Sequence, residues 1–303
     1  MAFRIGMVKY LNTLPLVQGL EAWREAELHA AVPSKLAGML AGDPASGREP
    51  EVDVALVSVI DAARSAVPLA MLPVGMIGCE GPTLTVRLFS AVPPERIGAV
   101  HADTDSHTSV ALCRVILARA YGVKPEVIDF DARERVALGR RGGGVGTEEP
   151  EWPETLLLIG DKVVTDSPPA VRYPHQLDLG EAWKALTGLP FVYAVWMCRA
   201  ADAGSADVGL IADMLDRQRR RNTSRLDWIV DRLAAERGWP PDLARTYLGS
   251  LLRYEVGPRE REAVVRFFDE AAGLGLIAPT VPRWAEARRV REGEPVAVGG
   301  AGS

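Results

Sequence analysis

The stretch RIGMVKYLNTLPLVQGLEAWRE, residues 4–25, opens an alternation of strand-like and helical patterns that decides the fold class. Its first apolar run, 4–8, predicts a strand, and residues 16–25 predict a helix. The same order returns in LHAAVPSKLAGML (28–40) and in DVALVSVIDAARS (53–65). Strands that alternate with helices are typical of α/β folds, so we predict an α/β protein.

A second series of the same kind starts after a predicted strand at 84–91. It contains strands near 97–100, 127–130 and 155–159 and a long helix at about 106–121. The glycine- and proline-rich stretch 139–154 predicts an exposed loop. We interpret this series as a second lobe.

The C-terminal third changes character, because a strand pattern at 189–199 is followed by residues 208–272 that are almost wholly helical. Residues 231–237 and 258–271 have the apolar period of helices that lie over a core. After residue 279 the chain has little apolar material to pack, so 279–303 are predicted to form a flexible tail.

The composition indicates a folded protein and narrows its partners. Of the 303 residues, 48% are hydrophobic and 25% are charged, as in ordinary globular proteins. The net charge of -5 argues against nucleic-acid binding. The apolar runs are too short to cross a membrane, and the N-terminal stretch lacks the apolar centre of a signal peptide. We therefore predict a cytoplasmic protein without a membrane partner, whose oligomeric state stays open.

Cysteines and histidines give no sign of a disulfide framework or a metal site. Cys79, Cys113 and Cys198 are far apart and odd in number, which predicts reduced thiols. The 4 histidines lack metal-ligand spacing, and the sequence contains no P-loop, HExxH motif or CxxC pair. We predict neither a metal nor a cofactor.

Two polar segments are candidates for a binding site, and the first is YLNTLP, residues 10–15. Asn12 and Thr13 follow a predicted buried strand. Ligands of open α/β sheets gather at the carboxyl ends of strands, where an amide can orient a polar group. Capping of the next helix by Asn12 or Thr13 is the structural alternative.

The second segment is DSHTS, residues 105–109, at the start of the predicted long helix. Free backbone N–H groups at a helix N-terminus, joined by the hydroxyls of Ser106, Thr108 and Ser109, suit a carboxylate or phosphate. Helix capping is again the alternative, and it needs only one of these residues.

Together with further stretches, these segments closely resemble the chorismate dehydratase family of the futalosine route to menaquinone. The resemblance rests on RIGMVKYLNTLPL (4–16), DSHTSVALCRVIL (105–117), LLLIGDKVV (156–164), DLGEAWKALTGLPFVYAVW (178–196) and YLGSLLRYEVGPRERE (247–262), which stand in the order of the family. It covers nearly the whole chain, from residue 4 to about residue 277.

The resemblance implies a two-lobed fold like that of type II periplasmic binding proteins, with a ligand in the cleft between the lobes. Lobe one would comprise 1–88 and 194–278 with a helical C-terminal cover, and lobe two 89–193, with crossover strands near 88–91 and 191–195. The implied activity is that of a hydro-lyase, which removes water from chorismate to leave 3-[(1-carboxyvinyl)oxy]benzoate without a cofactor.

Site residues follow from the same resemblance. It implies Asn12 as the catalytic residue and substrate-binding roles for Tyr10, Thr13, Thr85, Ser106, His107, Thr108, Ser109 and Asp161. His107 stands where the family often has arginine, and Thr85 stands where it commonly has serine. Because these groups include no strong base, we expect the enolpyruvyl carboxylate of chorismate to take the ring proton.

Two other functions stay open. A protein of this fold can bind a small carboxylate without turning it over. The related enzyme that processes cyclic dehypoxanthinyl futalosine shares the fold, although the YLN and SHTS segments favour the dehydratase.

Overall fold

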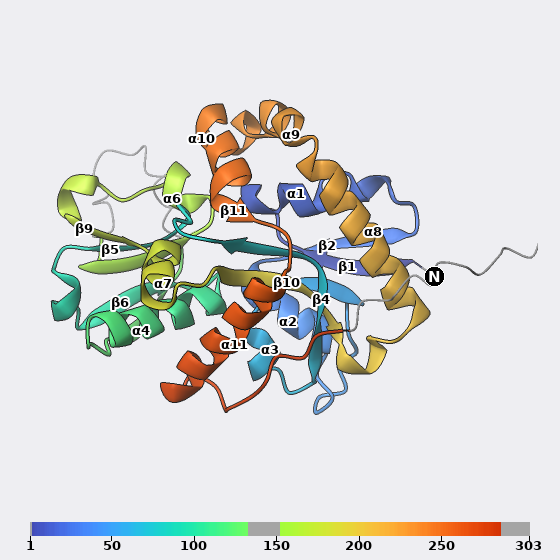
Figure 1. Cartoon of the computed structure of the whole chain (residues 1–303), viewed down its shortest axis with the longest axis horizontal. Coiled ribbons are helices and arrows are strands. Elements are labelled where there is room, and N and C mark those ends of the chain that lie inside the picture. The colour runs from blue at the N-terminus through green and yellow to red at the C-terminus, as the bar shows by residue number, and fades with distance from the viewer. Residues whose placement is uncertain (1, 133–151, 286–303) are drawn as a thin grey trace, which may run out of the picture.

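The structure is a computed structural model that describes residues 2–132 and 152–285. It has two lobes, and each is built on one β-sheet flanked by helices (Figure 1). The predicted α/β class and two-lobed architecture are thereby confirmed.

The first lobe contains a 6-stranded sheet in the order β11-β4-β10-β3-β1-β2, and the second a 5-stranded sheet in the order β7-β6-β8-β5-β9. The strands of the first sheet are β1 (Phe3–Met7), β2 (Ala26–Ala30), β3 (Val54–Ser58), β4 (Leu69–Cys79), β10 (Phe191–Arg199) and β11 (Leu252–Arg253). Those of the second are β5 (Val86–Ser90), β6 (Ala99–Asp103), β7 (Glu126–Phe130), β8 (Thr155–Ile159) and β9 (His175–Asp178). Because β1 and β3 run parallel, their carboxyl ends lie at one edge of the first sheet.

Helices cover both faces of the first sheet, with α8 and α9 on one side and α2 and α3 on the other (Figure 1). The helices are α1 (Leu14–Val17), α2 (Pro33–Ala41), α3 (Asp61–Arg64), α4 (His107–Ala120), α6 (Lys162–Thr165), α7 (Leu179–Thr187), α8 (Ala206–Thr223), α9 (Leu226–Leu233), α10 (Pro241–Thr246) and α11 (Pro258–Gly273). Successive residues of β3 enter different core clusters, since Leu56 belongs to the cluster that contains Ile211 of α8 and Val57 to the cluster that contains Leu36 of α2. A strand covered on both faces is largely apolar, which explains the run VALV that precedes Ser58.

The last helix, α11, joins the two lobes. Phe267 packs against Phe191 of β10 and Trp183 of α7, with ring centroids 5.0 and 6.0 Å apart. Glu270 accepts a 2.6 Å ion pair from Arg119 of α4. The helical cover is therefore not confined to the first lobe.

The chain passes between the lobes at residues 80–85 and 188–190, after β4 and before β10. The crossovers predicted near 88–91 and 191–195 lie a few residues after these passages, since 88–90 belong to β5 of the second sheet and 191–195 to β10 of the first. The lobe bounds predicted at 88/89 and 193/194 therefore fall within strands. The sequence pattern does not predict β4 at all, since Pro73 and Gly75 interrupt its apolar run.

Three further predictions concern the helix at 16–25, the loop at 139–154 and the tail at 279–303. The helix expected at 16–25 is α1 followed by a 3-10 turn, Leu20–Ala22, because Gly19 between them takes a left-handed φ of 91°. Part of the expected tail is docked, since Met71 of β4 donates to Arg283 and accepts from Ala285, at 2.8 and 2.9 Å. Residues 139–151 of the expected loop and 286–303 of the tail lie outside the described residues.

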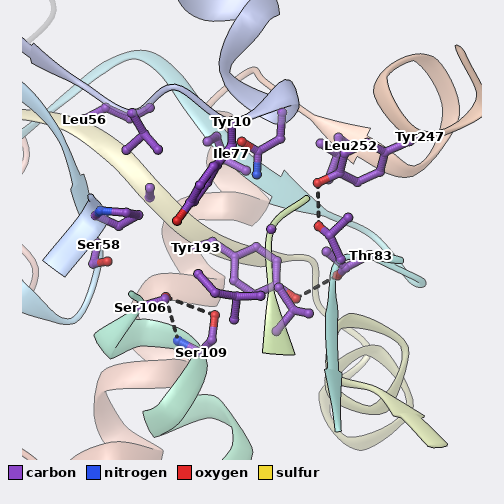
Figure 2. Close-up of a pocket in the computed structure, with 18 residues that line it drawn as sticks. Tyr10, Leu56, Ser58, Ile77, Thr83, Ser106, Ser109, Tyr193, Tyr247 and Leu252 are labelled. Atoms are coloured by element: carbon purple, nitrogen blue, oxygen red, sulfur yellow. Dashed lines mark hydrogen bonds between the residues drawn. The ribbon is translucent and has the colours of Figure 1, made fainter. Parts of the chain in front are cut away.

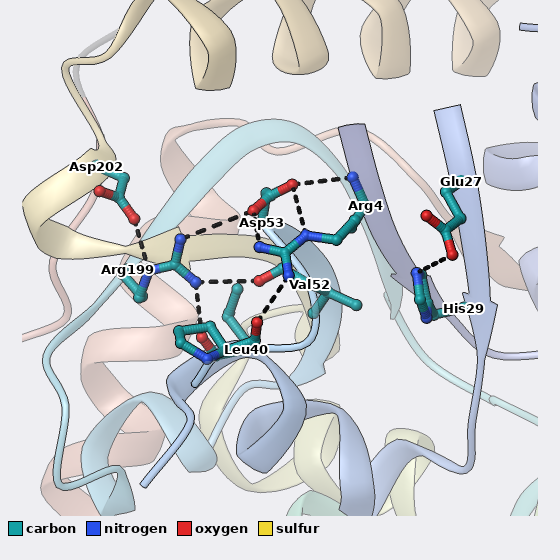
Figure 3. A network of polar contacts seen from close by, with 9 residues as sticks. Arg4, Glu27, His29, Leu40, Val52, Asp53, Arg199 and Asp202 are labelled. Carbon is teal, nitrogen blue, oxygen red and sulfur yellow. Dashed lines mark hydrogen bonds and ion pairs between the residues drawn. The ribbon is translucent and has the colours of Figure 1, made fainter. Parts of the chain in front are cut away.

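A polar network fastens the strand that leads to the candidate site (Figure 3). Asp53 accepts hydrogen bonds from the backbone N–H of Arg4 at 2.9 Å and from its guanidinium at 2.6 Å. Arg199 of β10 donates to the carbonyl of Val52 at 3.0 Å and lies 3.9 Å from Asp53. Burial raises the pKa of the Asp53 carboxyl, but the hydrogen bonds and charges of the arginines outweigh burial, so this pKa lies below its ordinary value.

Candidate active site

A narrow cavity of about 50 Å³ lies in the cleft between the lobes (Figure 2). Its walls come from the ends of β1 and β3, the first passage between the lobes, the N-terminus of α4, and β10. The polar residues that line it are Tyr10, Asn12, Ser58, Thr83, Thr85, Ser106, Ser109, Tyr193 and Tyr247. Among the described residues that line it, none carries a charged side chain, so the cavity offers hydroxyl, amide and backbone groups.

Asn12 lies in the 3-10 turn that follows β1, and its Oδ1 atom is buried without a hydrogen-bond partner among the described residues. The backbone N–H of Leu11 donates to both carboxylate oxygens of Asp161, at 3.2 and 3.1 Å. The Thr13 hydroxyl donates to two preceding backbone carbonyls, both at 2.8 Å, and does not line the cavity. Neighbouring residues hold the turn, and Asn12 presents an unsatisfied amide oxygen, which favours a ligand contact over helix capping.

Residues 160–162 of the second lobe hold this turn from across the cleft. Asp161, predicted as a substrate contact, instead binds the turn and is not among the lining residues, and burial raises the pKa of its carboxyl. Gly160 has a φ of 69°, and a Cβ there would lie 3.3 Å from the Tyr10 ring. Lys162 pairs at 2.6 Å with Asp105, which accepts a 2.8 Å hydrogen bond from the Tyr10 hydroxyl. The Tyr10 ring is thereby fixed across the cleft.

The N-terminus of α4 contributes two serines to the cavity. Ser106 is the N-cap, and its Oγ accepts from the backbone N–H of Ser109 at 3.3 Å and donates to the Ser109 hydroxyl at 3.0 Å. Residues three apart share one face of a helix, so both hydroxyls line the cavity at the positive end of the helix dipole. The capping alternative is therefore realised by Ser106 alone.

The two intervening residues bind the first lobe and do not line the cavity, in contrast to their predicted substrate contact. The Nδ1 atom of His107 lies 2.9 Å from Asp61 of α3. Thr108 accepts a hydrogen bond from the backbone N–H of Ile60 at 3.3 Å. Successive helix positions point about 100° apart, so these side chains face the neighbouring lobe.

Tyr247 is a lining residue that sequence reasoning missed. It lies on a π-helical turn, Tyr247–Leu251, and stacks on Trp239 with ring centroids 5.0 Å apart and an interplanar angle of 9°. Its hydroxyl lies 2.5 Å from that of Thr85. Burial raises the pKa of the Tyr247 hydroxyl, while hydrogen bonds from Thr85 and Asn12 lower it. Tyr247 stands inside the quoted stretch 247–262, but no local pattern distinguishes it from a core aromatic.

Thr83 and Tyr193 form a second hydrogen-bonded pair in the wall, with their hydroxyl oxygens 2.7 Å apart. The Thr83 hydroxyl also lies 3.1 Å from the thiol of Cys79. Burial raises the pKa of this thiol to about 11, so the thiol stays protonated at neutral pH and is a poor nucleophile.

The lobes are closed on one another in this structure, because the bonds from Tyr10 to Asp105 and from Leu11 to Asp161 cross the cleft. A cavity of about 50 Å³ is too small for a ring-sized substrate. Ligand entry therefore requires the lobes to part or the Tyr10 ring to move.

Residues 2–132 and 152–285 contain no cluster of three or more His, Cys, Asp or Glu side chains suited to hold a metal ion. Within the same residues, no helix combines the length and the apolar character that crossing a membrane requires.

Comparisons with known proteins agree with the fold and with the sequence motifs. Residues 3–273 match the protein-family profile described as menaquinone biosynthesis. The chorismate dehydratase of Thermus thermophilus is 30% identical over 284 residues, which cover 89% of this chain and 95% of that protein. A protein of Archaeoglobus fulgidus has the same fold, with a TM-score of 0.62, 14% identity and coverage of 91% of this chain and 98% of its own. So does the periplasmic aliphatic sulphonate binding protein of Escherichia coli, with a TM-score of 0.55, 15% identity and coverage of 92% and 94%. The resemblance seen in the motifs is confirmed, and the chain belongs to the menaquinone biosynthesis family.

Proposed function

We propose that the protein removes water from chorismate to form 3-[(1-carboxyvinyl)oxy]benzoate. The observation that carries this proposal is the buried, unpartnered Oδ1 of Asn12 in an interlobe cavity that Ser106 and Ser109 also line. The relative named chorismate dehydratase, 30% identical over most of both chains, supports the same substrate. The cytoplasmic location and the independence from cofactors stay predictions from the sequence.

The N-terminus of α4 is the part of the cavity best suited to a substrate carboxylate. Backbone N–H groups of its first turn have no partner within the helix, and the positive end of the dipole stabilises an anion by about 0.3–2 kcal/mol. The Ser109 hydroxyl, which accepts the hydrogen of Ser106, adds one donor at the same place. Chorismate carries two carboxylates, so one binds here while the amide of Asn12 holds the departing ring hydroxyl.

The proton acceptor in this proposal is the enolpyruvyl carboxylate of chorismate itself. A ring C–H bond breaks, its electrons complete the aromatic ring, and the C–O bond to the neighbouring hydroxyl breaks. The departing hydroxide then recovers the proton from the carboxyl group, so water and the dianionic product leave. The absence of a charged side chain from the described lining supports this assignment, since His107 binds Asp61 and Asp161 binds Leu11. The protein contributes by fixing the conformer in which the carboxylate reaches the proton.

The activity is tested by mixing the purified protein with chorismate and following the products by chromatography with mass detection. We expect a species of substrate minus water to form at a rate proportional to protein concentration, unchanged by a chelator. Binding of chorismate without this product would overturn the proposal and leave a carboxylate-binding protein of the same fold.

The role of Asn12 is tested by Asn12→Asp, which keeps the size of the side chain but removes its N–H donors and adds negative charge. Because the added carboxylate charge opposes a departing hydroxide at the place where the neutral Oδ1 faces the cavity, we expect kcat to fall by roughly 100- to 1000-fold, as for the loss of one positioned polar contact. Thr13→Ser is the matched control, because it retains the hydroxyl that binds the two backbone carbonyls outside the cavity. An Asn12→Asp enzyme with normal kcat would remove Asn12 from the mechanism.

A further inference from the structure

We propose that Asp178 is a positioning residue, which holds Leu84 in a left-handed conformation and thereby directs Thr83 and Thr85 into the active-site cavity. The inference rests on the proposed function, since it concerns residues that line the proposed chorismate site. All three of Thr83, Leu84 and Thr85 lie in the first passage between the lobes, residues 80–85.

Leu84 carries the strain in this passage. Its φ of 72° is the sole positive φ of a non-glycine residue within 2–132 and 152–285. A side chain with a Cβ is disfavoured in this region, because the Cβ approaches the carbonyl oxygen too closely. Such a conformation persists where surrounding groups hold it, and it concentrates at functional sites.

The neighbours of Leu84 on both sides line the cavity. Thr83 bonds the Tyr193 hydroxyl at 2.7 Å, and Thr85 bonds the Tyr247 hydroxyl at 2.5 Å (Figure 2). If Leu84 relaxed to a negative φ, the chain direction would change between the two threonines. At least one of these hydroxyls would then leave its partner and its place in the cavity wall.

The carboxylate of Asp178 supplies the holding force. It accepts from the backbone N–H of Thr83 at 2.8 Å and from that of Leu84 at 2.6 Å. It also caps α7, by accepting from Gly180 at 3.0 Å and Glu181 at 3.2 Å. The side chain is buried, so these bonds are shielded from water. Capping needs only the bonds to α7, whereas the two shorter bonds go to the strained passage.

Close packing at Gly180 shows how tightly the passage is seated on α7. A Cβ on this glycine would lie 2.1 Å from the Thr83 hydroxyl oxygen and 2.6 Å from the Gly81 carbonyl oxygen. The backbone of α7 therefore touches the passage directly. A shift of Asp178 is transmitted to Thr83 without an intervening side chain.

The test compares glycine and alanine at position 84 in an Asp178→Asn background. Asp178→Asn weakens the hold, and we expect kcat/KM for chorismate to fall by roughly 10- to 100-fold, as for other small misplacements of substrate contacts. Glycine adopts the left-handed conformation freely. The double variant Asp178→Asn with Leu84→Gly should therefore regain about fivefold in kcat/KM. Leu84→Ala in the same background loses the same side-chain atoms beyond Cβ but keeps the strain, and it should regain nothing.

Two results would overturn the inference: normal kcat/KM in Asp178→Asn, whether or not its unfolding midpoint falls, or equal kcat/KM in the two double variants. Glu181→Gln is the control for charge at the start of α7, because Glu181 bonds Asp178 through its backbone alone.

A second measurement needs neither chorismate turnover nor a folded Asp178 variant. In the otherwise unchanged chain, urea unfolding should give Leu84→Gly a folding equilibrium constant about five times that of Leu84→Ala. Equal constants would mean that Leu84 is not strained, which overturns the inference whatever the protein's activity. A wild-type protein inactive on chorismate, with this difference present, would contradict the proposed function alone.

Discussion

Replacing Tyr247 by Phe removes one buried hydroxyl and leaves the packing of its ring in place. The hydroxyl lies 2.5 Å from that of Thr85, and both residues are 1% exposed. The phenyl ring can keep the stack on Trp239, so the change concerns the hydrogen bond. A buried hydroxyl that loses its partner costs about 1–3 kcal/mol, and we expect the free energy of unfolding to fall by that amount.

Tyr254→Phe is the matched control, because the Tyr254 hydroxyl is buried and has no hydrogen-bond partner among the described residues. Removing an unsatisfied hydroxyl should change the free energy of unfolding by less than about 0.5 kcal/mol, or should raise it. Urea unfolding followed by tryptophan fluorescence measures both variants against the wild-type protein.

The same comparison extends to turnover. Tyr247→Phe should lower kcat/KM for chorismate by about tenfold, since roughly 1.4 kcal/mol of positioning for Thr85 and Asn12 is lost. Tyr254→Phe should leave kcat/KM unchanged. Equal free energies of unfolding in the two variants, or wild-type stability and kcat/KM in Tyr247→Phe, would exclude a role for the hydrogen bond between Tyr247 and Thr85.

Three more predictions concern glycine, acid and histidine. Gly160→Ala and Gly122→Ala place a Cβ at φ of 69° and 70°, and each should cost about 1–2 kcal/mol of stability. Only the Cβ of Gly160→Ala meets the Tyr10 ring, at 3.3 Å, so kcat/KM for chorismate should fall in Gly160→Ala and stay unchanged in Gly122→Ala. Equal kcat/KM in the two variants would contradict a role for this contact. The lowered pKa of Asp53 stabilises the fold above pH about 4 and loses its effect as the pH falls through that pKa. The free energy of unfolding of Asp53→Asn should therefore be lower than that of the wild-type protein at pH 7, and the difference should narrow towards pH 3. A difference that does not change with pH would exclude this linkage. His107→Gln should change the KM for chorismate less than about twofold, because the ring lies outside the cavity, and a large rise in KM would return His107 to the substrate site.

Local sequence patterns accounted for most strands and helices, because each pattern depends on the residues of its own segment. The apolar runs at 4–8, 53–57 and 155–159 coincide within one residue with β1, β3 and β8. Two residues of each polar segment line the cavity, Tyr10 and Asn12 from 10–13 and Ser106 and Ser109 from 105–109. The motifs also sufficed to identify the family, which the comparisons confirmed.

Long-range packing accounts for what these patterns missed. β4 is a strand in spite of Pro73 because β10 pairs along it, an interaction between residues about 120 positions apart. Asp161 binds Leu11, and Tyr247 reaches Thr85, through distances in sequence that no local pattern records.

Four polar side chains stand in sequence at the start of α4, from its N-cap Ser106 to Ser109. The rotation of the helix points them in different directions. Ser106 and Ser109 line the cavity, whereas His107 and Thr108 bind the first lobe. Which face meets the cleft depends on how the two lobes close. Residue type and spacing therefore indicate that a site exists, and the packing of one lobe against the other selects the side chains that form it, because hydrogen bonds are made only between groups that the fold brings within about 3 Å.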